Sequence, residues 1–323
     1  MQPQPHDRSQ IRALIAEAEY ELAEGPHPER ARLDAEALLL HVLGKYPPER
    51  NRAWLMTHGN SKAIPGVGAN LRALVERRRA GEPIQYITGE QEFYGLPFRV
   101  TPDVLIPRPE TEHVVEKALE LAALPGSSVT GHDFSRAESG TKQDWALAPA
   151  GFQRIVDIGT GSGAIAVALA HHLRNAQITA LDISPAALEV ARENAIRNAV
   201  ADRIRFLLGD LLAPVVADRF DLVVSNPPYV PTADRDSLSV EVRDHEPGLA
   251  LFAGPDGLHI YHRLIPAAFA VLEPGGYLVM EIGYGQSAAV AAVLGDTGFE
   301  QIEFVPDLQG IPRVACGRRP GSC

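Results

Sequence analysis

The spacing of apolar residues divides the chain into two parts of different character. Through residues 11–22, 32–43 and 69–79, apolar side chains recur every three or four positions, which is typical of amphipathic helices. A shorter helix is expected near residues 52–57. We therefore predict a small all-helical domain over residues 1–90, with a role in substrate recognition or packing.

From residue 153 onward, short apolar runs alternate with helical patterns. The runs expected as strands are 154–157, 178–181, 204–208, 220–224, 277–282, 299–304 and 313–316, and the expected helices are 164–173, 185–198, 259–271 and 286–294. Such alternation is typical of an α/β fold with a doubly wound parallel sheet. The two closing strands predict an antiparallel addition at one edge.

Residues 91–105 join these parts. Their aromatic residues flank Gly95-Leu96-Pro97, which predicts a β-hairpin connector. The α/β domain is then expected over residues 106–323, beginning with a helix at 112–124. Within it, residues 125–150 are polar, rich in small residues and without periodicity, so we expect a flexible linker or insertion there.

Charge and cysteine content narrow the class of protein. The 323 residues carry a net charge of -11, and the first 90 are balanced, with 12 Lys/Arg and 12 Asp/Glu. A nucleic-acid surface would need a basic stripe, so we expect no direct nucleic-acid substrate. Cys316 and Cys323 form no metal spacing or disulfide framework, and no apolar stretch reaches the length of a membrane span. These features favour a cytoplasmic protein without a metal.

The stretch Val223–Val230 carries the most specific chemistry. A buried strand ends at Asn226, which is followed by Pro227, Pro228 and Tyr229. The prolines stiffen a loop at the carboxyl end of the strand, where open α/β sheets bind their ligands. Asn226 Oδ1 and the Pro227 carbonyl can accept both hydrogens of a planar –NH2 group, and Tyr229 can pack on its plane. The stretch resembles the Asn-Pro-Pro-Tyr motif of methyltransferases that alkylate such nitrogens, although a simple strand-ending turn is the plainer alternative.

A glycine loop indicates the second ligand. Residues 159–163 read Gly159, Thr160, Gly161, Ser162 and Gly163 between a strand and a helix, and Asp182 ends the next strand 23 residues after Gly159. A carboxylate there can accept both ribose hydroxyls of a nucleotide. The glycines alone fit NAD(P) as well as S-adenosylmethionine.

Two further carboxylates favour the methyl donor over the dinucleotide. Asp157 would repel a pyrophosphate but attract a methionine ammonium, and Asp210 ends the third strand where an adenine edge would lie. Helix capping by Asp182 and loop capping by Asp210 remain the structural alternatives.

With these pieces placed, the chain resembles the HemK/PrmC family of release factor glutamine methyltransferases over roughly residues 9–124 and 153–318. The resemblance rests on five motifs: Gly81-Glu82-Pro83-Ile84-Gln85-Tyr86-Ile87, Glu92-Phe93-Tyr94-Gly95-Leu96-Pro97-Phe98, Leu105-Ile106-Pro107-Arg108-Pro109-Glu110-Thr111-Glu112, Asp157–Gly163 and Asn226–Tyr229. Glu246-Pro247 and Ala250-Leu251 also match the segment that follows the family's catalytic loop.

The resemblance implies a Rossmann-like class I S-adenosylmethionine-dependent methyltransferase domain. It would transfer a methyl group to the side-chain amide nitrogen of the glutamine in the Gly-Gly-Gln motif of class-one peptide chain release factors, leaving S-adenosylhomocysteine. The residues implied for the cofactor are Asp157, Gly159, Thr160, Gly161, Ser162, Gly163, Asp182, Asp210, Leu211 and Asn226. Those implied for catalysis or substrate binding are Asn226, Pro227, Pro228, Tyr229, Phe98 and Arg108. Leu211 departs from relatives that carry an aromatic residue there.

Four alternatives stay open from the sequence. A ribosomal-protein glutamine methyltransferase is the closest, and an adenine-N6 nucleic-acid methyltransferase uses the same Asn-Pro-Pro-Tyr chemistry on a flipped base. A nicotinamide oxidoreductase would share the glycine loop but leave residues 226–229 unexplained. A non-catalytic binding module would not need the intact motifs.

Overall fold

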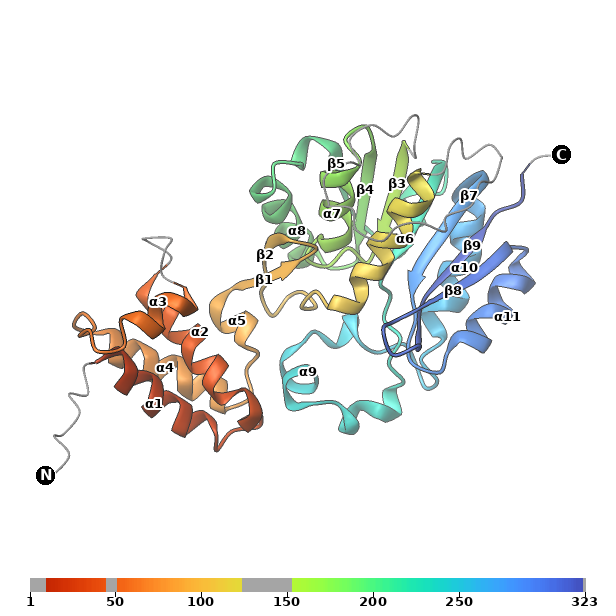
Figure 1. Cartoon of the computed structure of the whole chain (residues 1–323). Helices are drawn as coiled ribbons and strands as arrows, with labels where there is room; N and C mark the ends of the chain where they lie inside the picture. The colour runs from red at the N-terminus through yellow and green to blue at the C-terminus, as the bar shows by residue number, and fades with distance from the viewer. Residues whose placement is uncertain (1–9, 45–50, 124–152, 322–323) are drawn as a thin grey trace, which may run out of the picture. The chain divides into compact units, whose positions relative to one another are not determined.

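The computed structural model describes residues 10–44, 51–123 and 153–321. The chain forms two compact units, which are coloured along the sequence in Figure 1. The first unit combines Met1–Gly89 with Leu238–His245, and the second combines Glu90–Ser237 with Glu246–Cys323. The linker expected at residues 125–150 lies outside the described residues. No helix within these ranges is long and apolar enough to cross a membrane.

The first unit is helical. Its elements are α1 (Ile11–Leu22), η1 (Pro28–Arg30), α2 (Ala31–Leu43), α3 (Arg52–Thr57), α4 (Val67–Arg79), α5 (Ile84–Thr88) and α9 (Val240–His245). The predicted apolar stripes form its core: Leu14 and Ile15 of α1 pack with Leu38 of α2 and Leu71 of α4. Burial of these stripes supplies the helical unit with its own hydrophobic core.

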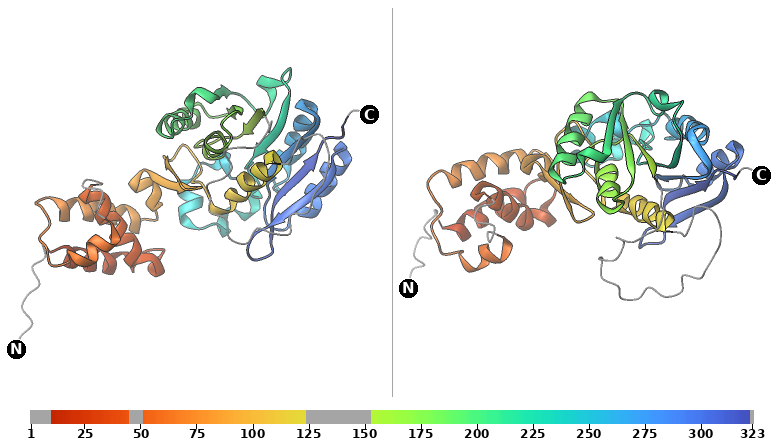
Figure 2. Two further views of the ribbon diagram at one scale, coloured as in Figure 1. Left: turned by 45° about the horizontal axis from the view of Figure 1, so that its top comes forward. Right: turned by 90° about the horizontal axis from the view of Figure 1, so that it is seen from above.

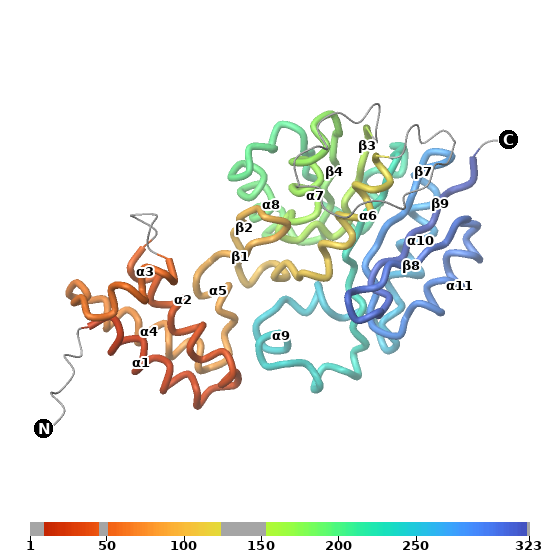
Figure 3. The backbone as a smooth tube through the Cα atoms, viewed as in Figure 1, coloured from red at the N-terminus to blue at the C-terminus, as the bar shows by residue number. Residues whose placement is uncertain are grey.

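The α9 segment was expected within the α/β domain, but the structure groups Leu238–His245 with the helical unit. Figure 3 traces the chain through this segment. Arg78 of α4 explains the grouping, because its guanidinium donates to Asp34 Oδ2 at 2.6 Å and also pairs with Glu241 of α9. Arg78 and Asp34 are each only 3% exposed, so the segment is held by a buried charge network.

The second unit is built on a seven-stranded sheet in the order β5-β4-β3-β6-β7-β9-β8. The strands are β3 (Arg154–Ile158), β4 (Gln177–Asp182), β5 (Ile204–Leu208), β6 (Phe220–Ser225), β7 (Leu272–Glu281), β8 (Glu300–Pro306) and β9 (Pro312–Arg318). The first five in this order are parallel, and β9 runs antiparallel to β7 and β8. The expected antiparallel addition at one edge is therefore confirmed.

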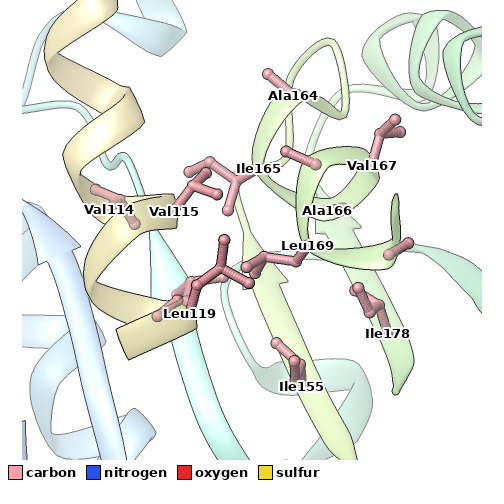
Figure 4. Packing of buried hydrophobic residues seen from close by; sticks show 14 of the residues in the cluster. Val114, Val115, Leu119, Ile155, Ala164, Ile165, Ala166, Val167, Leu169 and Ile178 are labelled. Carbon is pink, nitrogen blue, oxygen red and sulfur yellow. The ribbon is translucent and has the colours of Figure 1, made fainter. Parts of the chain in front are cut away.

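Helices cover both faces of the sheet, as the views in Figure 2 show. They are α6 (Glu112–Ala123), α7 (Ala164–His172), α8 (Pro185–Arg197), α10 (His259–Val271) and α11 (Ser287–Thr297), with short η2 (Pro109–Thr111), η4 (Ala201–Arg203), η5 (Ala213–Val215), η6 (Thr232–Ser237) and η7 (Gly248–Ala250). Successive strand residues point to opposite faces, so Ile155 packs with α6, α7 and α8, whereas Val156 packs with α10 and α11. Figure 4 shows Leu119 of α6 beside Leu169 of α7 on the Ile155 face.

A β-hairpin, β1 (Glu90–Phe93) and β2 (Leu96–Arg99), opens the second unit. Asn194 of α8, which is fully buried, bonds the backbone of Arg99 through both side-chain atoms and also donates to the Ser162 carbonyl at 2.8 Å. One amide therefore ties the hairpin to the loop that follows β3.

Candidate functional site

Parallel strands converge on a cavity of about 350 Å³ at their carboxyl ends. Asp182 at the end of β4 and Gly159, Asp210 and Asn226 in the loops after β3, β5 and β6 contribute to its wall. Ligands of open α/β sheets bind at this edge, and the volume lies within the usual range for small-molecule sites. The structure thus brings together most of the residues that the sequence indicated.

The glycine loop lines one side of the cavity. Gly159, Gly161 and Gly163 have backbone φ angles of 67°, 54° and 81°. Residues other than glycine rarely adopt positive φ angles. Thr160 and Ser162 lie between them, are almost completely buried and contribute to the wall. Gly163 serves packing instead, since a β-carbon there would lie 3.1 Å from the Ala191 β-carbon.

Asp182 faces the cavity from the end of β4. Its Oδ2 accepts from the Gly161 backbone N–H at 2.8 Å, and its Oδ1 accepts from the Ser184 N–H at 2.9 Å. Burial raises the pKa of this carboxyl group, while the backbone hydrogen bonds oppose that rise. Ser184, which accepts from Ala187 N at 3.2 Å, is the residue that caps α8. The alternative role of Asp182 as the helix cap is therefore excluded.

Asp157 differs from the expectation. It is completely buried, and the cavity wall within the described ranges does not include it. Its Oδ2 accepts from Thr160 Oγ1 at 2.6 Å and from Ala166 N at 3.2 Å, so the carboxyl group fastens the glycine loop to α7. Burial raises the pKa of Asp157 to about 7.

Asp210 and Leu211 also line the cavity, just after the end of β5. Asp210 forms an ion pair with Arg263 of α10, which also lines the cavity. Both groups of the pair are partly exposed, so the pair remains accessible to a ligand with hydrogen-bonding atoms. Leu211 contributes apolar surface and has a positive φ of 49°.

The Asn226 loop forms the wall nearest the end of β6. Ser225 Oγ donates to the Ile158 carbonyl at 2.7 Å and joins the loop to β3. Asn226 Nδ2 donates to Thr111 Oγ1 at 2.9 Å, and Pro227 and Pro228 line the cavity. Their stiff backbone presents the Asn226 amide at a defined place on the wall.

Tyr229 follows the two prolines but, among the described residues, is not part of the cavity wall. Its hydroxyl donates to Glu281 Oε1 at 3.1 Å, and its carbonyl accepts from Gln286 Nε2 at 3.0 Å. Burial raises the pKa of Glu281 to about 7, and it also raises the pKa of Tyr229. Tyr229 therefore anchors the loop in this structure.

Two expected substrate residues lie elsewhere. Phe98 has no exposed surface and packs edge-to-face on Phe93 in the core beneath the hairpin, so its assignment to substrate binding is wrong. Arg108 is paired with the buried Glu246, and the wall, as far as the chain is described, includes neither residue. The pair instead joins the loop before α6 to the segment that supplies Pro247 and Leu249 to the wall.

Several functional neighbours were not found by sequence reasoning. Thr111 accepts a hydrogen bond from Asn226, Glu281 accepts one from Tyr229, and Leu249 and Phe252 add apolar surface to the cavity wall. Thr111 stands within a quoted motif, and Phe252 directly follows Ala250-Leu251. The motifs could have marked these residues as important, but the sequence alone did not show that they lie beside the cavity.

Comparisons with known proteins cover most of the chain. The PrmC N-terminal domain matches residues 13–89, and the methyltransferase small domain matches residues 145–241. A release factor glutamine methyltransferase of Koribacter versatilis (strain Ellin345) is 41% identical over 303 residues, which are 94% of this chain and 95% of the relative. The chain belongs to the release factor glutamine methyltransferase family. A second member, from Geobacter sulfurreducens, is 42% identical and covers 90% of each chain.

Solved structures support the fold alone. The catalytic domain of hMettl16, in a complex with MAT2A 3'UTR hairpin 6, aligns with a TM-score of 0.51 at 16% identity, over 69% of this chain and 76% of that one. Membership of the release factor glutamine methyltransferase family removes the oxidoreductase and binding-module alternatives.

Proposed function

We propose that this protein transfers a methyl group from S-adenosylmethionine to the side-chain amide nitrogen of a release factor glutamine, the one in the Gly-Gly-Gln motif. The observation that carries the proposal is the Asn226 amide on the wall of the same cavity as the glycine loop. The glycine loop can thereby hold the methyl donor while the Asn226 loop holds the amide group that receives the methyl group.

The residues present fit the donor. The positive-φ glycines let the backbone approach a ligand closely, and Asp182 retains acceptor capacity beside its two backbone hydrogen bonds. Asp182 would accept from the ribose hydroxyls, and Asp210 and Leu211 would meet the adenine. When bound, S-adenosylmethionine supplies an activated sulfonium methyl group.

The chain's own contribution is orientation and electrostatics. Asn226 Oδ1 and the Pro227 carbonyl would accept the two amide hydrogens of the substrate, which directs the nitrogen lone pair toward the donor. As the carbon–nitrogen bond forms and the carbon–sulfur bond breaks, both acceptors stabilise the positive charge on the nitrogen. The product proton leaves to water, so no general base is needed.

A labelled-methyl transfer assay tests this function. The purified enzyme is incubated with a release factor, with the same factor carrying Gln→Ala in its Gly-Gly-Gln motif, and with duplex DNA. Label on the unaltered factor alone is expected. Label on the Gln→Ala factor would reject the proposed acceptor residue, and label on DNA would favour an adenine-N6 methyltransferase.

A further inference from the structure

A hydrogen-bonded chain leads from the Asn226 amide into the protein interior. Asn226 Nδ2 donates to Thr111 Oγ1 at 2.9 Å, and Thr111 Oγ1 lies 2.6 Å from Glu281 Oε2. The other carboxylate oxygen, Oε1, accepts from the Tyr229 hydroxyl at 3.1 Å. Glu281 therefore contacts both the residue that holds Asn226 and the aromatic end of the same loop.

The number of protons fixes the direction of each bond. An ionised carboxylate only accepts hydrogen bonds, and a threonine hydroxyl has a single proton to donate. With Glu281 ionised, the Thr111 proton is directed to Glu281 Oε2, so Thr111 Oγ1 offers a lone pair to its remaining neighbour. That neighbour must be the –NH2 group of Asn226, because the amide oxygen carries no proton.

We infer that Thr111 and Glu281 are positioning residues that hold the Asn226 side chain with Oδ1 directed at the substrate amide; this inference rests on the proposed function. A flipped Asn226 would present –NH2 to the substrate –NH2, with two donors facing each other. The acceptor needed for methyl transfer would then be lost although Asn226 itself remained in place.

Burial makes this arrangement rigid. Glu281 is 2% exposed and Thr111 is 4% exposed, so water does not compete for their hydrogen bonds. The charged and titratable groups around Glu281 are Glu110 before α6, Arg313 at β9, and the two tyrosines Tyr229 and Tyr261. Assays at pH 8 or above keep Glu281 in the ionised form that accepts both hydrogen bonds, since burial raises the pKa of Glu281 to about 7.

The inference also explains why two distant motifs occur together. Thr111 belongs to Pro109-Glu110-Thr111-Glu112, a stretch outside the glycine loop and the Asn226 loop. Pro109 stands at the first position of η2, the short helix that ends at Thr111. The motif thereby delivers one hydroxyl to the amide on which the chemistry depends.

The test removes that hydroxyl at nearly constant volume. Thr111→Val is compared with Thr111→Ser, which keeps the hydroxyl, and with Thr297→Val, which removes a hydroxyl bonded to Val293 O at 2.7 Å in α11. For Thr111→Val, kcat is expected to fall about tenfold, the effect of one hydrogen bond in the transition state. Affinity for S-adenosylmethionine should stay within about twofold, and Thr111→Ser should restore kcat.

A second readout is independent of activity. Solvent exchange of the Asn226 side-chain amide protons, followed by NMR, should be slow in the wild type and in Thr111→Ser, and faster in Thr111→Val. If Thr111→Val does not fold, Thr111→Ala, which adds no volume, replaces it in both measurements.

The two proposals fail in different ways. A wild-type enzyme that binds S-adenosylmethionine but labels no release factor rejects the proposed function, and the exchange measurement still tests the hydrogen-bonded chain. An active wild type with unchanged kcat and unchanged amide exchange in Thr111→Val overturns the positioning role. A fall in kcat that Thr111→Ser does not restore overturns it as well.

Discussion

Asn226 stands where two ligands are proposed to meet, and its described hydrogen bond uses Nδ2 and not Oδ1. Interactions that strengthen as charge develops act on turnover more than on binding. The side chain should therefore matter mainly for the chemical step.

Asn226→Ala is expected to lower kcat for methyl transfer by about 100-fold or more, in the range seen when one preorganised polar group is removed. The dissociation constant for S-adenosylmethionine, measured by calorimetry, should change by less than about threefold. Asn198→Ala, which removes an amide bonded to Pro97 O at 3.1 Å outside the cavity, is the control. Equal losses in turnover and cofactor affinity would contradict this role of Asn226.

The buried Glu281 makes a second residue-scale prediction, about stability. Its folded pKa of about 7 lies above its ordinary value of 4.5. The folded state therefore binds the proton more tightly, so this group's contribution to stability is complete below pH 4.5 and is lost as pH rises toward 7.

Glu281→Gln removes that titration while nearly keeping the shape of the side chain. Between pH 5 and 7, the free energy of unfolding should fall less steeply in the variant, by up to about 1.4 kcal/mol per pH unit. Urea denaturation at several pH values measures the slope, and Glu120→Gln at an exposed carboxylate should leave it unchanged. Identical slopes in Glu281→Gln and the wild type would show that Glu281 does not titrate in this range.

At the scale of elements, the turn between β3 and α7 depends on close packing. Gly163, with φ at 81°, lies against α8, where a β-carbon would meet Ala191 at 3.1 Å from its β-carbon and 3.2 Å from its α-carbon. The strand, the glycine loop and two helices are therefore fitted together at this one residue.

Gly163→Ala should destabilise the second unit by about 1–3 kcal/mol, through backbone strain and overpacking. Gly295→Ala is the matched control, because Gly295 is an exposed residue of α11 and nothing lies within 4 Å of the β-carbon it would add. There alanine should stabilise by about 0.5–1 kcal/mol. Native-state hydrogen exchange of amides in α7 and β4 measures both changes, and equal effects of the two substitutions would contradict the packing argument.

Sequence periodicity predicted the boundaries of most elements of the second unit to within one or two residues. Each of these helices has a buried apolar stripe, and most of these strands are buried apolar runs. In the first unit it missed α5, a five-residue helix bounded by Pro83 and Gly89, and α9, which has no buried residue. In the second unit, the prediction began β7 at Tyr277, whereas the strand begins at Leu272. The reason is that Pro274-Gly275-Gly276 resemble a turn. The cavity residues at the strand ends could be predicted, because open α/β sheets bind their ligands at the carboxyl ends of the parallel strands. The contact of Thr111 with Glu281 joins residues 170 positions apart, and no local pattern encodes such a pair.

At the scale of the whole molecule, each compact unit has a separate core, so the two need not unfold together. Arg78 should contribute strongly to the stability of the helical unit, because its removal leaves the buried Asp34 carboxylate without its closest cation. Breaking a buried pair by removing one partner is costly.

Arg78→Ala should destabilise the helical unit by about 3–5 kcal/mol, seen as faster hydrogen exchange in α2 and α4 with little change in β3 and β6. Its neighbour offers the control: Arg77→Ala removes a pair with Glu82 in which the arginine side chain is 45% exposed, and it should cost at most about 1 kcal/mol. Similar hydrogen-exchange rates in the two variants would show that the buried Arg78 pair stabilises the helical unit no more than the Arg77 pair does.

The assignment of Leu238–His245 to the helical unit has a consequence for recombination between relatives. A chimera with a single crossover after Gly89 would combine the helices of one parent with the α9 segment of the other. Arg78 and Glu241 would then come from different parents. Exchange of the helical unit between family members therefore calls for a double graft, in which both stretches travel together.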